Sequence, residues 1–248
     1  MIINNKKIFM KVCLIFLFGI GLRFAYATPS THIWAPSTDI QPFGRWHITS
    51  DIYIPLENDE EGNVLPPVTN LGLTVGILPF ERFNMELGFD HKAGLGDLDE
   101  YPFYFNAKAG IPEGSFGRFF PAVAIGIYDV GTEHNQTDFN IVYLKIAKST
   151  LLGRFSAGYF SGNSELLLDE EGNVDNEGIF AAWERVMKEI SDRLWICVEY
   201  MGTESSYGAW SFGFSYKFVD DVSILCGYNI YNNENIADTF TIQVDIDF

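Results

Sequence analysis

Apolar residues recur at every second position through most of this chain, in runs of about ten residues. The final run is the clearest: its apolar set is Phe240, Ile242, Val244, Ile246 and Phe248, and its polar set is Thr239, Thr241, Gln243, Asp245 and Asp247. Successive side chains of a β-strand point to opposite faces, so this period predicts strands with one apolar and one polar face. The helical period, about 3.6 residues, is rare here.

The alternation places twelve strands along the chain. The strand at 178–187 is the least regular, because its Ala181–Arg185 core could equally form a short helix. Connections after odd-numbered strands are mostly long and those after even-numbered strands are mostly short, with 111–118 as the exception. The twelve segments are 44–54, 69–78, 83–91, 102–110, 119–129, 139–148, 152–161, 178–187, 193–202, 207–217, 221–231 and 238–248.

Long loops at one rim and tight turns at the other are typical of a bacterial transmembrane β-barrel. A soluble antiparallel sandwich would also alternate, but its outward face should be densely charged. Here the polar face is mostly Gly, Ser, Thr and Asn, and aromatic residues crowd the apolar face. The sequence therefore predicts an all-β fold: a transmembrane antiparallel up-and-down β-barrel of about 12 strands, within a range of about 10–14.

A secretory signal peptide is predicted at residues 1–27. Lys6, Lys7 and Lys11 precede an apolar run over 12–22, and Ala25-Tyr26-Ala27 is a small-x-small cleavage pattern. The expected organisation is a signal peptide over 1–27, an N-terminal periplasmic segment over 28–43 and a transmembrane barrel over 44–248.

Charge and hydropathy exclude two classes of protein. Cleavage after Ala27 removes four basic residues and no acid, which changes the formal net charge from −17 to −21. Such an acidic surface argues against binding to nucleic acid. No later segment offers about 18 consecutive apolar residues, which argues against a helical membrane protein.

The C-terminal run resembles the terminal assembly signal of Gram-negative outer-membrane β-barrel proteins. Its apolar residues stand at every second position and its last residue is Phe248. This resemblance, together with the signal peptide, implies passage through the periplasm and insertion into the outer membrane by the barrel-assembly machinery. It assigns the assembly signal to Phe240, Ile242, Val244, Ile246 and Phe248, and it identifies a porin-like barrel without a narrower family.

In a barrel the polar face lines the lumen, and acids outnumber bases there. An open lumen of this kind would favour cations, whereas Lys108 and Arg154 would pair with nearby carboxylates if the interior were plugged. The predicted function is a porin-like passive channel for small polar or cationic solutes. The alternative is a non-conducting barrel that serves adhesion, membrane integrity or lipid modification. The expected lumen-lining residues are Asp51, Glu86, Asp90, Lys108, Arg154, Glu199, Gln243 and Asp245.

Catalysis has little support in the sequence, and no catalytic residue, cofactor or metal is predicted. His47 and Thr49 share a face two residues apart, which is a poor match to the nucleophile and base of an outer-membrane lipid hydrolase. His91 and His134 fall near the outer rim beside acids and could hold a metal, but loop histidines are more often solvated.

The two cysteines beyond the signal peptide, Cys197 and Cys226, are expected on opposite faces of non-neighbouring strands. A disulfide would need their Cα atoms to be close, so both are expected as free thiols.

The predicted long loops are strongly acidic, and Lys92 is the one base that the sequence places among them. These loops could share divalent cations with lipopolysaccharide in the outer leaflet, although charge for solubility explains them as well. The acids are Glu57, Asp59, Glu60, Glu61, Asp97, Asp99, Glu100, Glu165, Asp169, Glu170, Glu171, Asp175 and Glu177.

The hexamer Asp-Glu-Glu-Gly-Asn-Val occurs twice, at 59–64 and at 169–174. A calcium loop of the EF-hand type would need an acid six positions after the glycine, where this chain has Val68 and Gly178. Both copies follow odd-numbered strands, the first and the seventh. They are therefore expected as the same kind of chain reversal, on opposite sides of one rim of the barrel.

Overall fold

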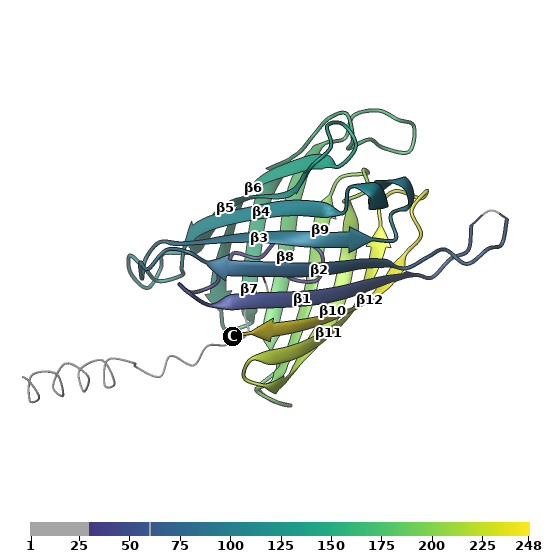
Figure 1. Ribbon diagram of the computed structural model, residues 1–248. Helices are drawn as coiled ribbons and strands as arrows, with labels where there is room; N and C mark the ends of the chain where they lie inside the picture. The colour runs from purple at the N-terminus through teal and green to yellow at the C-terminus, as the bar shows by residue number, and fades with distance from the viewer. Residues whose placement is uncertain (1–29, 60) are drawn as a thin grey trace, which may run out of the picture.

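The computed structural model describes residues 30–59 and 61–248, so the predicted signal peptide over 1–27 lies outside the described residues. Twelve antiparallel strands form a closed barrel in which each strand pairs with its neighbours in sequence and β1 pairs with β12 (Figure 1). The strands are β1 (Trp46–Pro55), β2 (Val68–Gly76), β3 (Asn84–Ala93), β4 (Phe103–Ile111), β5 (Ala122–Gly131), β6 (Asp138–Thr150), β7 (Gly153–Ser161), β8 (Glu177–Val186), β9 (Leu194–Gly202), β10 (Ala209–Val219), β11 (Val222–Tyr231) and β12 (Thr239–Asp247).

The predicted all-β barrel of twelve strands is confirmed. The ambiguous segment forms strand β8, because pairing with β7 and β9 decides the conformation of a sequence whose own preference is weak. Lys92 belongs to β3 rather than to the following loop, and its side chain turns into the barrel to meet Asp129 at 2.6 Å. That loop contains a short 3₁₀ helix, η1 (Gly96–Glu100).

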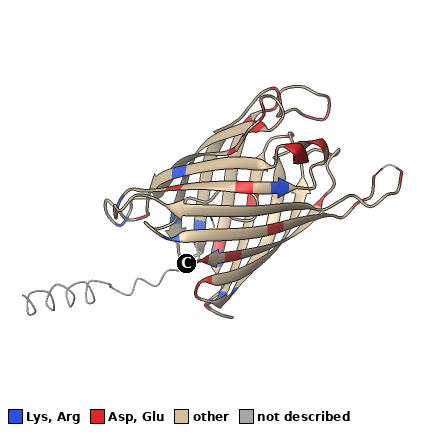
Figure 2. Ribbon diagram, viewed as in Figure 1, with Lys and Arg blue, Asp and Glu red and all other residues tan. Residues whose placement is uncertain are grey.

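The two ends of the barrel differ, as the loop lengths predict. Figure 1 shows the long connections at one end, which we call the long-loop rim, and the tight turns together with the C-terminus at the other, the short-turn rim. The hairpin after β1 projects furthest from the long-loop rim, and Figure 2 shows acidic residues at its tip. The exception among the short turns is again the β4–β5 connection, over 112–121.

The strand faces carry the expected chemistry. Outward side chains are large, apolar and exposed, whereas their neighbours in sequence point inward and are buried. On β3, for example, Leu87 and Phe89 are exposed while Glu86 is 4% exposed. An apolar outer band on a closed barrel suits a bilayer, because every backbone group of the wall is paired. Within the described residues, no helix is long and apolar enough to cross a membrane.

The repeated hexamer forms the same hairpin tip in both places. In the second copy, Asp169 Oδ1 accepts from the backbone N–H of Glu171 at 3.0 Å and of Asn173 at 2.7 Å. In the first copy, Asp59 accepts from Glu61 and Asn63 at the same two distances. The glycines have φ near +84° and +83°, a left-handed conformation that glycine adopts without steric cost. The hexamer is thus one local solution used twice, after β1 and after β7.

The tip after β1 gives a testable pH dependence. The hydrogen bond from the Asn63 side chain, with those from the backbone of the same turn, lowers the pKa of Asp59. A carboxylate whose pKa is lowered by folding stabilises its turn at pH values above the ordinary carboxyl pKa. That stabilisation is lost as the pH falls through the lowered pKa of the folded state.

We therefore expect the amide NMR signals of Glu61 and Asn63 to hold their positions as the pH falls through about 3.9, where an unperturbed aspartate titrates, and to move only below it. In the Asp59→Ala variant, the amide signals of Glu61 and Asn63 should lose the chemical-shift positions of the folded turn at all pH values. Movement of both signals at the ordinary carboxyl pKa in the unmodified protein would contradict the hydrogen-bonded turn.

Candidate functional site

Residues 30–43, which we call the N-terminal segment, lie inside the barrel. The sequence places this stretch in a periplasmic segment ahead of the first strand, but most side chains from His32 to Thr38 are buried. The segment leaves through the short-turn rim, where Phe43 forms a bridge with Gly76 at the end of β2. Nothing in the sequence of this segment indicates its partners on the barrel wall, which lie far away along the chain.

Glu199 on β9 is the main anchor of the N-terminal segment. Its Oε1 atom accepts three consecutive backbone N–H groups, from Ile33 at 3.1 Å, Trp34 at 2.5 Å and Ala35 at 3.2 Å. The carboxylate is 2% exposed. Three converging amides form a small anion-binding nest, so the turn at 33–35 is built around this one side chain.

Basic residues of the wall hold the rest of the segment. Lys145 on β6 donates to Pro36 O at 2.8 Å, and Lys108 on β4 donates to Ser30 O at 2.9 Å. Arg154 on β7 contacts Asp39 Oδ2 at 2.8 Å and Glu184 at 3.2 Å. The segment thus supplies one partner to each of these cations, while carboxylates of the wall pair with two of them, Glu184 with Arg154 and Glu86 with Lys108 at 3.0 Å.

An aromatic cluster fills the space beside the segment. The Trp34 ring packs against Tyr53, Tyr207 and Tyr231, with centroids 5.5–6.1 Å apart, and its indole N–H donates to Tyr207 O at 2.9 Å. Next to it, buried apolar side chains from β6 to β9 and from the long loops form one cluster: Ala35, Ile141, Tyr143, Phe160, Leu167, Phe180, Met201 and Tyr207. The β6–β10 side of the lumen is therefore filled.

All eight residues expected in the lumen lie on inward-facing strand positions, but they divide into two groups. Lys108, Arg154 and Glu199 hold the N-terminal segment, as does Gln243, which donates to Ile33 O at 2.7 Å. Glu86 belongs with them, because it accepts from Gln41 N at 2.7 Å and pairs with Lys108 at 3.0 Å. The remaining three, Asp51, Asp90 and Asp245, face open space.

That space is a cavity of about 640 Å³ along the β1–β5 side, bounded on its inner flank by Trp34 and Pro36. At the long-loop rim it is lined by Pro66, Leu95 and Ile236, and at its other end by His47 and Thr74. His47 pairs with Thr74 one position from the pair that ends the strands at the short-turn rim. The cavity therefore extends over nearly the full height of the wall.

The middle of the cavity carries two carboxylates that no basic side chain contacts among the described residues. The Asn70 amide lies between them, with Nδ2 at 3.1 Å from Asp51 and 3.3 Å from Asp90. Thr49 donates to Asp51 at 2.6 Å, and Asn106 donates to Asp90 at 2.5 Å. Neutral donors therefore hold both groups in place in the middle of the cavity.

The candidate catalytic and metal-binding histidines of the sequence are not brought into such sites. His47 lies between Asp247 at 2.8 Å and Asp245 at 3.3 Å, while Thr49 donates to Asp51. His91 points outward and packs against Phe103, on the opposite face from Asp90. His134 is exposed and contacts Asp138 at 3.0 Å.

Sequence reasoning missed the residues that fill the lumen, above all His32, Trp34 and Lys145. His32 joins Cys197 and Glu199 in a group whose ligand-type atoms all lie within 4.8 Å of one another. Both cysteines are free, and Cys197 is buried inside the barrel. The side chain of Cys226 stands on the outer face of β11, as its strand phase predicts.

No protein-family model matches this chain, and no curated protein matches it. Among solved structures, an outer-membrane channel from Pseudomonas putida F1 is 10% identical, with a TM-score of 0.48 over 86% of this chain and 98% of that one. OmpF of Salmonella typhi, in complex with daunomycin, is 6% identical, with a TM-score of 0.43 over 82% of this chain and 96% of that one. A triple mutant of Rhodopseudomonas blastica porin is 11% identical, with a TM-score of 0.39 over 73% of this chain and 55% of that one.

The architecture itself decides the class. An even number of antiparallel strands closes into a barrel with an apolar outer face, a polar inner face, and long and short connections segregated to opposite rims. The chain therefore folds as a twelve-stranded β-barrel of the transmembrane type.

Proposed function

We propose that this barrel is a passive channel of the bacterial outer membrane, reached after export by a cleaved signal peptide, for small polar or cationic solutes. The observation that carries the proposal is the cavity lined from Pro66 and Ile236 at the long-loop rim to His47 and Thr74 near the short-turn rim. A space that extends over nearly the full height of the wall is what a solute path through a barrel requires. The N-terminal segment leaves free only the β1–β5 side, so the solutes are small.

The charge of the lining supports a preference for cations. Five acids line the cavity, Asp51, Glu86, Asp90, Asp129 and Asp245, against two lysines, Lys92 and Lys108. Each lysine is already paired, Lys92 with Asp129 at 2.6 Å and Lys108 with Glu86 at 3.0 Å. Asp245 lies 3.3 Å from His47, so the lining acids that no basic side chain contacts are Asp51 and Asp90, and low-dielectric walls concentrate the field of such charges along the path.

Reconstitution of the refolded full chain into planar bilayers tests the proposal. We expect small, stepwise conductance, with a reversal potential in a salt gradient that indicates a preference for cations. Absence of steps from protein that shows heat-modifiable gel migration would refute the channel and favour a non-conducting barrel filled by its own N-terminal segment.

The double variant Asp51→Asn, Asp90→Asn should move the reversal potential most of the way to zero. Both changes keep the side-chain shape and an acceptor oxygen for Asn70, so the cavity keeps its width while losing two charges. The matched control is Asp192→Asn, an exposed acid in the turn between β8 and β9. An equal shift in the control would attribute the selectivity to general surface charge.

A further inference from the structure

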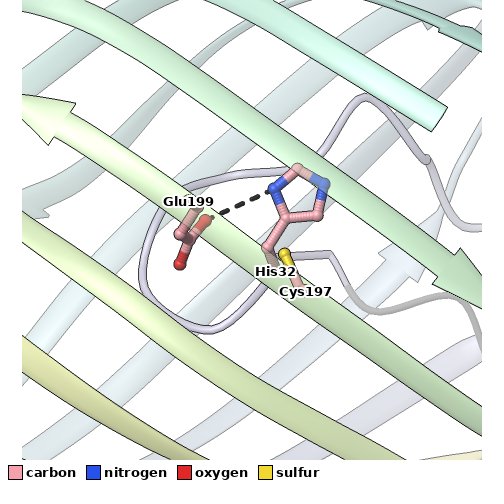
Figure 3. A group of neighbouring side chains, drawn as sticks. All are labelled: His32, Cys197 and Glu199. Carbon is pink, nitrogen blue, oxygen red and sulfur yellow. Dashed lines mark ion pairs between the residues drawn. The ribbon is translucent and has the colours of Figure 1, made fainter. Parts of the chain in front are cut away.

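The group formed by His32, Cys197 and Glu199 has the composition of a metal site. Cys197 and Glu199 stand two residues apart on β9 and therefore point into the same interior, where His32 of the N-terminal segment meets them (Figure 3). The three side chains are 1–2% exposed. Imidazole nitrogen, thiolate sulfur and carboxylate oxygen together are donors that suit Zn²⁺ and similar borderline ions, whereas Ca²⁺ and Mg²⁺ prefer oxygen alone.

The contacts of His32 conflict with each other when no cation is present. Its Nδ1 atom lies 3.4 Å from Glu199 Oε2 and 3.3 Å from the Lys145 ammonium. If Nδ1 carries a proton for Glu199, that N–H and the Lys145 ammonium are two donors that face each other. If Nδ1 instead accepts from Lys145, its lone pair and Glu199 Oε2 face one another with no proton between them.

Glu199 Oε2 supplies a second, independent observation. The other oxygen of this carboxylate takes three backbone donors, but Oε2 is fully buried and has no hydrogen-bond partner among the described residues. A buried carboxylate oxygen without a donor is costly, and such atoms in folded proteins call for an ion or another partner.

We propose that His32 Nδ1, Cys197 Sγ and Glu199 Oε2 bind one Zn²⁺-like divalent cation, with water in the fourth tetrahedral position. Binding joins the three atoms to the metal, and the thiol proton leaves to solvent. Glu184 Oε1, 3.4 Å from His32 Nε2, then holds the ring proton on the far side, an arrangement that commonly orients metal-bound histidines. Lys145 has partners apart from His32, because it donates to Pro36 O at 2.8 Å and lies over the Phe180 ring.

The consequence is a second attachment of the N-terminal segment to the inside of the barrel. The metal would tie the N-terminal segment to β9, in addition to the nest at Glu199. Because this inference concerns what the segment binds and not whether solute passes beside it, metal binding and conductance are independent measurements, and failure of one leaves the other standing.

The test uses the refolded full chain in detergent with Zn²⁺ and, as a spectroscopic probe, Co²⁺. We expect about one Zn²⁺ per chain to remain after gel filtration, and Co²⁺ to give the thiolate-to-metal charge-transfer band that sulfur ligation produces. Cys197→Ser should abolish the band and lose the retained metal. The matched control, Cys226→Ser, changes the outward thiol and should behave like the unmodified protein.

Heat-modifiable gel migration shows that each variant is folded, and His32→Gln provides a second ligand change outside the barrel wall. Two results would overturn the site. One is that the unmodified chain retains no metal. The other is that Cys197→Ser retains as much metal as the unmodified chain although it lacks the sulfur band. The latter outcome would assign the metal to the acidic loops.

Discussion

Deletion of residues 30–41 should raise the single-channel conductance severalfold. The N-terminal segment and the side chains packed on it fill the β6–β10 side of the lumen, whereas the cavity occupies the other side. Twelve strands enclose an interior intermediate between small barrels filled by side chains and the wide lumen of about 16 strands. Removing the segment widens the path beside it, and conductance rises with the cross-section of the path.

Trp34→Ala is a smaller change to the same segment. It removes one large ring between Tyr53, Tyr207 and Tyr231 and leaves the Glu199 nest intact, so we expect a smaller increase with the same selectivity. Bilayer recordings of both variants, after a gel-migration check of folding, give the measurement. Unchanged conductance in a folded deletion variant would show that the segment does not narrow the path.

Glu199→Ala should release the N-terminal segment at a cost of about 3–5 kcal/mol in its docking free energy, the usual loss when one partner of a buried charge pair is removed. Three backbone N–H groups lose their acceptor, and Lys145 and His32 lose a neighbouring negative charge. Hydrogen–deuterium exchange should therefore quicken by orders of magnitude at Ile33, Trp34 and Ala35, while the strands keep their protection.

Two variants sharpen this result. Glu199→Gln keeps an acceptor oxygen of the same shape, so its exchange should fall between those of the unmodified chain and the alanine variant. Glu165→Ala removes an exposed loop carboxylate and should leave exchange in the segment unchanged. Protection at 33–35 that survives in Glu199→Ala would mean that aromatic packing alone holds the segment.

The barrel wall could be predicted from sequence because its information is local. On β12, residues two positions apart have the same polarity, which shows which of them face the lumen and which face outward. The same period places Cys197 inside and Cys226 outside. Even β8, whose own preference is ambiguous, is fixed by the strands on either side. Boundaries were less certain, as with Lys92, because a strand ends where its partner ends and not where its own pattern stops.

The contents of the lumen could not be predicted in the same way. The alternation states that Glu199, Lys108 and Arg154 point inward, but it does not state which of them meets the chain's own backbone. Residues 30–43 show neither strand nor helix periodicity, so the sequence assigns no structural role to His32 or Trp34. Their roles arise from contacts across more than a hundred residues, which no local pattern records.

The contacts of the N-terminal segment also fix the order in which this protein can mature. Its backbone is held by Lys145, Glu199 and Gln243, which lie 109, up to 166 and 210 residues later in the chain. Gln243 belongs to β12, the strand whose pairing with β1 completes the wall. The full set of contacts to the segment therefore needs the last strand in place, and contacts so distant in sequence form slowly. The N-terminal segment can therefore complete its contacts only after β12 has joined the wall, so the final packing of the lumen depends on closure of the barrel.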